Sequence, residues 1–228
     1  MKKYISSALA LIAVVFNTGC NDPADNVPDA KVNEPAEQAA AAPTAESANA
    51  TPSGASVADV KSFVIGGDSK INFLASKAIG GEQPGGFKKF EGTLNVADGK
   101  LVAAGSKIVI DMDSIWTNSE KLTTHLKNAD FFNVPEIPTT TFEATGITET
   151  EGNMEITGDL TMHGVKKSIS FPAEFTVTDE TASLKAEFSI NRFDFDMKYP
   201  GQADNLIREA VVITLDVTAA PKAANDQG

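Results

Sequence analysis

The 228-residue chain is poor in the residues that most often carry covalent, metal or redox chemistry. It has one cysteine, Cys20, two histidines, His125 and His163, and one tryptophan. A lone cysteine cannot form an intramolecular disulfide, so sulfur does not cross-link the fold. The short signatures of zinc proteases, zinc fingers, phosphate-binding loops and serine hydrolases are also missing, which removes the commonest sequence grounds for an enzyme.

Long apolar runs are scarce as well. Residues 8–16, "ALALIAVVF", form a nine-residue run, whereas about 20 residues are needed to span a bilayer. Because two lysines precede this run, we expect residues 1–20 to be an export signal peptide. Its end, "NTGC", resembles the lipobox of bacterial lipoproteins, although Asn17 departs from the usual pattern. The resemblance implies lipidation of Cys20 and a lipid-anchored protein of the bacterial cell envelope that faces the periplasm. A soluble periplasmic protein is the alternative.

Basic residues are in deficit. The chain has 19 Lys and Arg against 31 Asp and Glu, a formal net charge of −12. Such a surface repels a phosphate backbone, so nucleic acid is not an expected partner.

Composition divides the rest of the chain into three parts. Residues 21–56 are rich in Ala, Pro and acidic residues and have no aromatic residue. Such a segment buries too little apolar surface to offset its ordering entropy, so we expect a disordered linker with an average reach of about 30 Å. Residues 57–219 are long enough for one domain with a sizeable core. Residues 220–228 are expected to be a polar tail.

Apolar and polar residues alternate with period two through most of the domain, which predicts β-strands. The clearest alternation lies in residues 107–113, 141–145, 154–162, 168–177, 183–190 and 211–217. Further strands are expected near Phe63 to Phe73 and on either side of Asp98 and Gly99, a hairpin signal. The pattern predicts an all-β fold of eight antiparallel strands that close into a barrel, with one short α-helix. A β-sandwich is the alternative, because alternation alone does not separate the two.

The short helix is expected at residues 117–127. Thr117 stands three residues before Glu120, the spacing of a capping box. Leu122 and Leu126 fall on one helical face, with His125 expected to point to a different side.

His163 has the parity of the polar positions of its strand and precedes a glycine, so we expect a polar turn residue. His125 and His163 could combine with Asp130 or Glu136 on a metal ion. However, their separation of 38 residues matches no short zinc motif, so no metal site is expected.

Several separated segments resemble the YceI-like family of exported bacterial proteins, in the right order from Val60 to about Val217. They are "GGFKKFEGTLNV", "IDMDSIWT", "SIWTNSEKLTTHLKNADFFNVPEIPTTTF", "GDLTMHGVKKSISFP", "FSINRFDFDMKYPG" and "IREAVVITLDV". This resemblance implies a lipocalin-like barrel with an elongated apolar pocket. The implied ligands are polyisoprenoids, isoprenoid quinones or similar long-chain lipids.

The aromatic composition also favours an apolar lining, because the chain has 13 Phe but only two Tyr and Phe brings no polar atom. The alternative for each such residue is ordinary core packing. The predicted ligand-binding residues are Phe73, Phe87, Phe90, Ile110, Met112, Trp116, Phe131, Phe132, Phe142, Leu160, Phe171, Phe175, Phe188, Ile190, Phe193 and Phe195. Among them, Phe87, Phe90, Trp116, Phe131 and Phe132 are expected near the barrel mouth. Arg192 and Arg208 are expected to form surface ion pairs with Asp194 or Glu209. The alternative is that they orient a polar head group of the ligand.

The predicted function is binding of a long-chain apolar ligand inside the barrel for storage, transport or sensing in the cell envelope. No catalytic residue and no cofactor other than such a lipid is expected. One alternative is a structural or stress-related envelope module with a filled barrel, and a second is an enzyme that acts on such a lipid. The sequence leaves the oligomeric state open, and a homodimer is one alternative.

Overall fold

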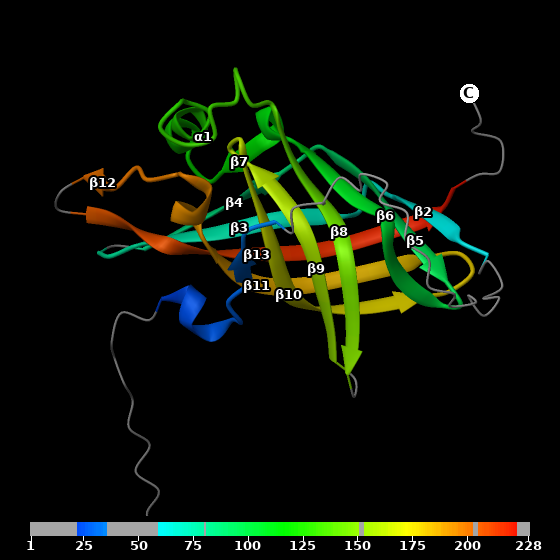
Figure 1. The fold of residues 1–228 in the computed structure, drawn as a ribbon. Helices are drawn as coiled ribbons and strands as arrows, with labels where there is room; N and C mark the ends of the chain where they lie inside the picture. Colours follow the sequence, from blue (N-terminus) through cyan, green and yellow to red (C-terminus); the bar gives the residue numbers. More distant parts are fainter. Residues whose placement is uncertain (1–21, 36–58, 80, 151–152, 203–204, 223–228) are drawn as a thin grey trace, which may run out of the picture.

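A computed structural model describes residues 22–35, 59–79, 81–150, 153–202 and 205–222, which form a twisted antiparallel β-barrel (Figure 1). Successive strands are neighbours, and the sheet closes because β13 pairs with β11 on one edge and with β2 and β3 on the other. The prediction of an eight-stranded barrel with one α-helix is therefore confirmed, and the β-sandwich alternative is wrong. The long strands are β8 (Thr139–Thr150), β9 (Asn153–Met162), β10 (Val165–Val177), β11 (Ala182–Asn191) and β13 (Asn205–Pro221).

The other three barrel strands are each broken into two pieces. They are β2 (Lys61–Ile65) with β3 (Lys70–Lys77), β4 (Glu82–Phe87) with β5 (Phe90–Ala97), and β6 (Lys100–Asp111) with β7 (Ile115–Thr117). The 3-10 turn η2 (Met112–Ser114) makes the third break. At one end β13 pairs with β2 and β2 with β5, whereas at the other the order is β13, β3, β4, β7. The breaks let each strand change direction, so the barrel has two differently built ends.

The helix α1 (Glu120–Leu126) covers the end formed by β3, β4 and β7, which is called the mouth below. The 3-10 turn η3 (Arg192–Phe195) and the short strand β12 (Gly201–Gln202) lie between β11 and β13 at this same end (Figure 1). No helix among the described residues is both long and apolar enough to cross a membrane.

The main core lies inside the barrel, because each strand turns its apolar positions inward. Fully buried side chains include Phe63, Ile156, Ile169, Phe195 and Val217. A row of rings crosses this core, with centroids 5.5 Å apart for Phe142 and Phe171 and 4.2 Å apart for the stacked rings of Phe171 and Phe188. Close ring pairs of this kind add to the stabilisation from buried area.

A seam opens in the barrel wall between β10 and β11. The two strands form four residue pairs, from Glu174 with Lys185 to Val177 with Ala182. The same register, continued, would put Ser170 opposite Ser189. Instead, β1 (Lys31–Asn33) pairs with Ser168 to Ser170 of β10.

On the other side of the seam, Ala30 N donates to Ser189 O (2.8 Å) and Ser189 N donates to Pro28 O (2.9 Å). Residues 22–35, called the N-terminal strap below, therefore supply the missing wall of the seam. The strap begins with the 3-10 turn η1 (Pro23–Asn26), in which Ala24 is buried, and Val32 packs against the barrel core.

The strap corrects the predicted domain boundaries. The expectation of a disordered linker from residue 21 is wrong for residues 22–35, while residues 36–56 lie outside the described residues. Composition could not find the strap, because main-chain hydrogen bonds to strands far along the chain hold it. The predicted tail is also partly wrong, because β13 continues to Pro221, which pairs with Phe63.

We predict that Val32→Asp detaches the strap without unfolding the barrel. Burying a carboxylate against the core costs several kcal/mol, more than a three-residue strand supplies. The amide of Ser189 should then exchange with solvent at least about tenfold faster, equivalent to about 1.4 kcal/mol. Asn33→Asp, at an exposed position of β1, is the control and should leave exchange unchanged. Unchanged protection of Ser189 in Val32→Asp would show that the strap does not close the seam.

We also predict that Gly158→Ala destabilises the barrel. A Cβ at Gly158 would lie 2.3 Å from Cζ of Phe142 and 2.6 Å from the Glu143 carbonyl oxygen, so the ring row must shift at a cost of about 1–3 kcal/mol. In Gly146→Ala on neighbouring β8, the nearest contact would be 3.7 Å, and stability should not fall. Urea unfolding of the two variants measures the difference, and equal midpoints would contradict the close contact.

Candidate functional site

The start of α1 is set by Ser119, whose Oγ accepts a hydrogen bond from Leu122 N (3.4 Å). Thr117 lies in β7 instead, and its Oγ1 accepts from Ser119 N (3.1 Å). The predicted capping box beginning at Thr117 is therefore wrong, because the helix begins two residues later. Leu122 and Leu126 share one face of α1, as predicted, and the structure places that face on the barrel, where both join the apolar cluster at the mouth.

A pocket of about 280 Å³ opens between α1, the ends of β3 and β4, β12 and the start of β13. The apolar residues that line it, called the floor below, are Leu122, Phe131, Tyr199 and Ile207. Polar side chains around it are Lys77, Gln83, Ser119, Lys121 and His125. Apolar walls with a few polar groups are the usual composition of small-molecule sites.

His125 lies beside Leu122 in this pocket, which corrects the expectation that it points to a different side. Residues three apart on a helix are surface neighbours, so the spacing already placed the two together. The His125 ring lies 5.1 Å from Phe131 and 5.0 Å from Tyr199, centroid to centroid, and both pairs are edge-to-face. Its Nε2 pairs with Asp130 Oδ2 at 3.3 Å. The imidazole is therefore held in one orientation at the pocket wall.

The pocket floor continues into the barrel through phenylalanines. Phe73 and Phe87 lie 5.9 Å apart, and Phe87 and Phe132 lie 6.4 Å apart, centroid to centroid. Phe132 packs against both the mouth cluster and the main core. An unbroken apolar path therefore runs from the pocket to the barrel interior.

Arg192 holds the chain that carries Tyr199 and Ile207. The side chain is buried, and its three nitrogens donate to main-chain carbonyls: Nε to Arg208 O (3.1 Å), Nη2 to Ile207 O (3.2 Å) and Nη1 to Met197 O. Burial lowers the pKa of this guanidinium, and Glu209 opposes that effect.

The expected ion pairs with Asp194 or Glu209 are found for neither arginine. Arg192 uses main-chain partners and lies over the ring of Phe193, 4.6 Å from its centroid. Arg208 pairs with Asp22 of the strap at 3.2 Å. The local sequence could not predict these partners, because those of Arg192 are main-chain atoms and that of Arg208 is a residue 186 positions away.

The predicted ligand-binding residues fall into three groups. Phe73, Phe87, Phe131 and Phe132 belong to the mouth cluster. Phe142, Leu160, Phe171, Phe175, Phe188, Ile190 and Phe195 belong to the main core or pack against it. Phe90, Ile110, Trp116, Phe193 and Met112 lie in neither cluster; the first four are half-buried and Met112 is buried in η2.

Three floor residues were missing from the prediction: Leu122, Tyr199 and Ile207. Leu122 was assigned only to a helix face. Tyr199, one of two tyrosines and next to Pro200 and Gly201, carried a weak compositional signal. Ile207 carried none, because its place follows from the pairing of β13 with β3.

His163 forms the β9–β10 turn together with Gly164, with φ values of 52° and 76°. This confirms the predicted turn position. Its Nδ1 donates to Phe195 O at 3.1 Å, so its partner comes from η3 and not from the hairpin. Among the described residues no three His, Cys, Asp or Glu side chains are grouped as a metal site would require.

A second hollow of about 430 Å³ lies at the opposite end of the barrel, beside Phe63, Val96 and Val177. Three carboxylates and a lysine surround it: Asp59, Asp98, Asp179 and Lys61. The mouth pocket is the better candidate for an apolar ligand, because no carboxylate lines it and its floor continues into the core.

These features define a lipocalin-like barrel, with eight antiparallel strands around an apolar interior and a helix over one end. The chain belongs to the YceI-like family, because residues 64–219 match the YceI-like domain.

Among its relatives, a UPF0312 protein of Pseudomonas putida strain GB-1 is 36% identical over 143 residues, which are 59% of this chain and 71% of that protein. Protein YceI of Escherichia coli O17:K52:H18 is 32% identical over 120 residues, 50% of this chain and 63% of that protein.

Solved structures share the fold at lower identity. A polyisoprenoid binding domain from Saccharophagus degradans implicated in plant cell wall breakdown superposes with a TM-score of 0.58 at 15% identity, covering 72% of this chain and 100% of that one. Burkholderia cenocepacia BcnA gives 0.56 at 20% identity, covering 67% and 97%. At these identities the likeness concerns the fold alone.

We predict that Arg192→Leu destabilises the protein by about 2–4 kcal/mol, because buried carbonyl oxygens lose their donors. Lys185→Leu, at an exposed position of β11, removes a charge in the same way but should change stability by less than about 0.5 kcal/mol. Guanidinium unfolding of both variants gives the comparison. Similar small losses in the two would show that water replaces the guanidinium at these carbonyls.

Proposed function

We propose that the protein binds a long-chain apolar ligand, a polyisoprenoid, an isoprenoid quinone or a similar lipid, whose chain enters the barrel from the mouth pocket. The observation that carries the proposal is the contact of Phe132 with both apolar clusters. It gives a long chain a continuous apolar surface from the pocket inward. The polyisoprenoid binding domain with the same fold supports this class of ligand.

Partly exposed side chains along this route supply the contact surface. Phe73, Phe87, Phe132, Phe142 and Leu160 are all half-buried although they pack against the two clusters. Each CH₂ of a ligand buried against them contributes about 0.8 kcal/mol, so a chain of ten carbons has ample binding energy.

The polar groups at the pocket suit a head group with hydrogen-bond acceptors. Lys77 and Lys121 are donors, and His125 donates or accepts according to its tautomer. Contacts of this kind select a head group and fix its orientation, while the apolar chain supplies most of the affinity. We assign the protein no catalytic step. His125 and Asp130 form a pair at the pocket wall, but among the described residues no serine or threonine hydroxyl is hydrogen-bonded to that pair as a nucleophile would be.

We further propose that the protein is exported and held at a membrane of the cell envelope by acyl chains on Cys20. The support is the order of the first 20 residues: lysines, a nine-residue apolar run, then "NTGC". The protein would store, carry or sense its ligand at that membrane.

The test uses the single tryptophan, Trp116, whose fluorescence a bound quinone quenches. We expect the full chain to bind a prenylated benzoquinone, and Leu122→Asp to weaken that binding at least about 30-fold, equivalent to about 2 kcal/mol for a charge placed in an apolar floor. Val64→Asp is the matched control, because Val64 is exposed on β2 at the other end of the barrel. Its affinity should equal that of the unchanged chain.

Two outcomes would contradict the proposal. Unchanged affinity in a folded Leu122→Asp variant would exclude the mouth pocket and direct attention to the hollow beside Phe63. No binding of the quinone or of farnesol, together with no lipid in an organic extract of protein from its native envelope, would favour a structural module with a filled barrel.

A further inference from the structure

Two exposed apolar side chains stand together at the mouth end of the barrel. Ile79, in the β3–β4 turn, is 68% exposed, and Leu206, at the start of β13, is 50% exposed. The β3–β4 turn contacts the start of β13, since Ala78 N donates to Leu206 O at 2.8 Å. Ile79 and Leu206 are called the apolar tip below.

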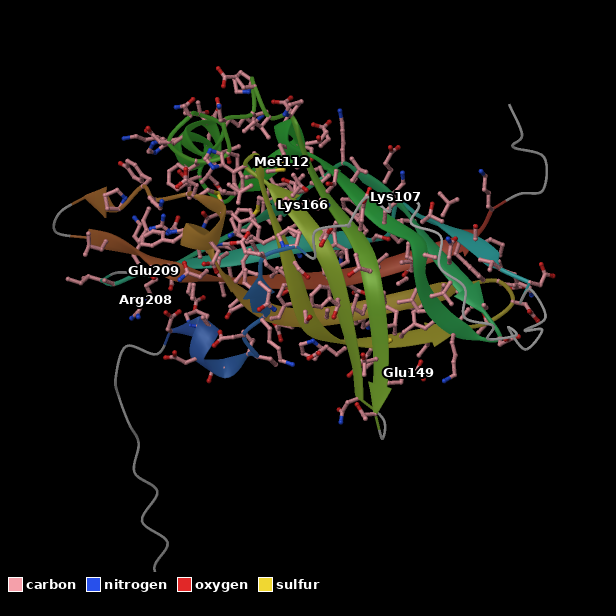
Figure 2. The ribbon with its side chains drawn as sticks, viewed as in Figure 1. Lys107, Met112, Glu149, Lys166, Arg208 and Glu209 are labelled. Carbon is pink, nitrogen blue, oxygen red and sulfur yellow. The ribbon has the colours of Figure 1, made fainter. Side chains whose placement is uncertain are left out.

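The apolar tip adjoins the mouth pocket. Lys77 lies two positions before Ile79, and Ile207 directly follows Leu206. Both Lys77 and Ile207 line that pocket. In Figure 2, the labelled Arg208 and Glu209 lie at this same end of the molecule, near β12 and η1. A surface that received the tip would therefore lie close to the pocket opening.

The N-terminal strap begins at the same place. Asp22 is buried; its Oδ1 accepts from Ser76 Oγ at 3.0 Å and its Oδ2 pairs with Arg208 Nη1 at 3.2 Å. Ser76 is three residues before Ile79, and Arg208 is two residues after Leu206. The strap is thus fixed to the barrel beside the apolar tip.

Asp22 is two residues from Cys20, and two residues span at most about 7 Å. Chain length alone would therefore keep acyl chains on Cys20 at the end of the barrel where the tip lies. A flexible linker of the length first expected would have left the orientation of the barrel free, whereas the docked strap does not.

We propose that the apolar tip is a membrane-docking surface, with Ile79 and Leu206 in the bilayer interface and the mouth pocket opening toward the lipid. This rests on the proposed function and its anchor, and adds the orientation of the site. A long-chain ligand would then pass between bilayer and pocket with little apolar surface crossing water.

Charge supports insertion over electrostatic attraction. Around the tip, Lys77 and Arg208 are offset by Glu82 and Glu209, and Arg208 is already paired with Asp22. A surface of both signs gains little from anionic lipid, since attraction of that kind needs a cluster of basic residues. Docking through aliphatic side chains should accordingly depend little on salt.

The first experiment measures lipid contact at chosen positions in the full chain, produced in cells that acylate lipoproteins and reconstituted in phosphatidylcholine vesicles. Ile79→Cys, Leu206→Cys and the control Val64→Cys each add one thiol, which is the sole free thiol when Cys20 is acylated. An environment-sensitive fluorophore on each reports quenching by nitroxides on the lipid chains. We expect quenching at 79 and 206 to exceed that at 64 at least threefold.

Intact mass separates the anchor from the docking. An acylated chain with equal quenching at all three positions overturns the docking surface and leaves the anchor standing. A chain without the acyl mass overturns the anchor. Cys20→Ala is then added to each variant so that the introduced thiol is again the only one, and tip contact in those chains keeps the docking surface. A chain with neither overturns both, and quinone affinity in solution reports on the proposed function separately.

The second experiment measures transfer. In Ile79→Asp/Leu206→Asp, uptake of a prenylated benzoquinone from vesicles should be about tenfold slower, with unchanged affinity for quinone supplied in solution. Both sites are exposed, so the fold should tolerate the changes. Val64→Asp should take up quinone at the rate of the unchanged chain. Equal uptake rates in all three proteins would overturn the role of the tip, and loss of affinity in solution would place the tip residues in the pocket instead.

Discussion

Closure of the sheet through β13 is the constraint on which the other features depend. Its hydrogen bonds to β11 run along ten residue pairs, and its opposite edge is divided between β3 and β2. One strand therefore sets the register of both ends of the barrel. It also places Ile207 in the mouth pocket and supplies two of the carbonyls that Arg192 binds.

The functional features lie where the regular pairing of strands stops. At the mouth the broken strands leave room for α1, whose leucines reach the apolar interior through Phe132. At the seam β10 and β11 diverge, and a segment from the start of the described chain fills the gap. Regular strand pairing in the rest of the barrel holds the mouth and the seam in fixed positions relative to each other.

Local patterns in the sequence predicted the frame well and the irregular places poorly. Alternation predicted the antiparallel strands, because each strand has one solvent-facing and one core-facing side in its own sequence, but it did not separate a barrel from a sandwich. The turn at His163 was predictable for the same reason. Arg192, Tyr199 and the strap were not predictable. Arg192 binds main-chain atoms, Tyr199 packs on rings of the α1 region about 70 positions away, and the strap pairs with strands more than a hundred positions away. The choice of phenylalanines that contact a ligand stays a prediction. A ring that lines a pocket and a ring that packs in the core occupy the same positions in the alternating pattern.

The strap has a consequence for the order of events during folding. Its residues are synthesised before the barrel strands, and Ser189, which its main chain bonds, is made about 160 residues later. The loop closed by that contact is among the longest in the chain, and such contacts form late because the loop entropy must be offset first. Until then the facing edges of β10 and β11 stay unpaired, and exposed strand edges are sites of self-association. A contact that forms late is thus one that protects the newly folded barrel from joining its neighbours.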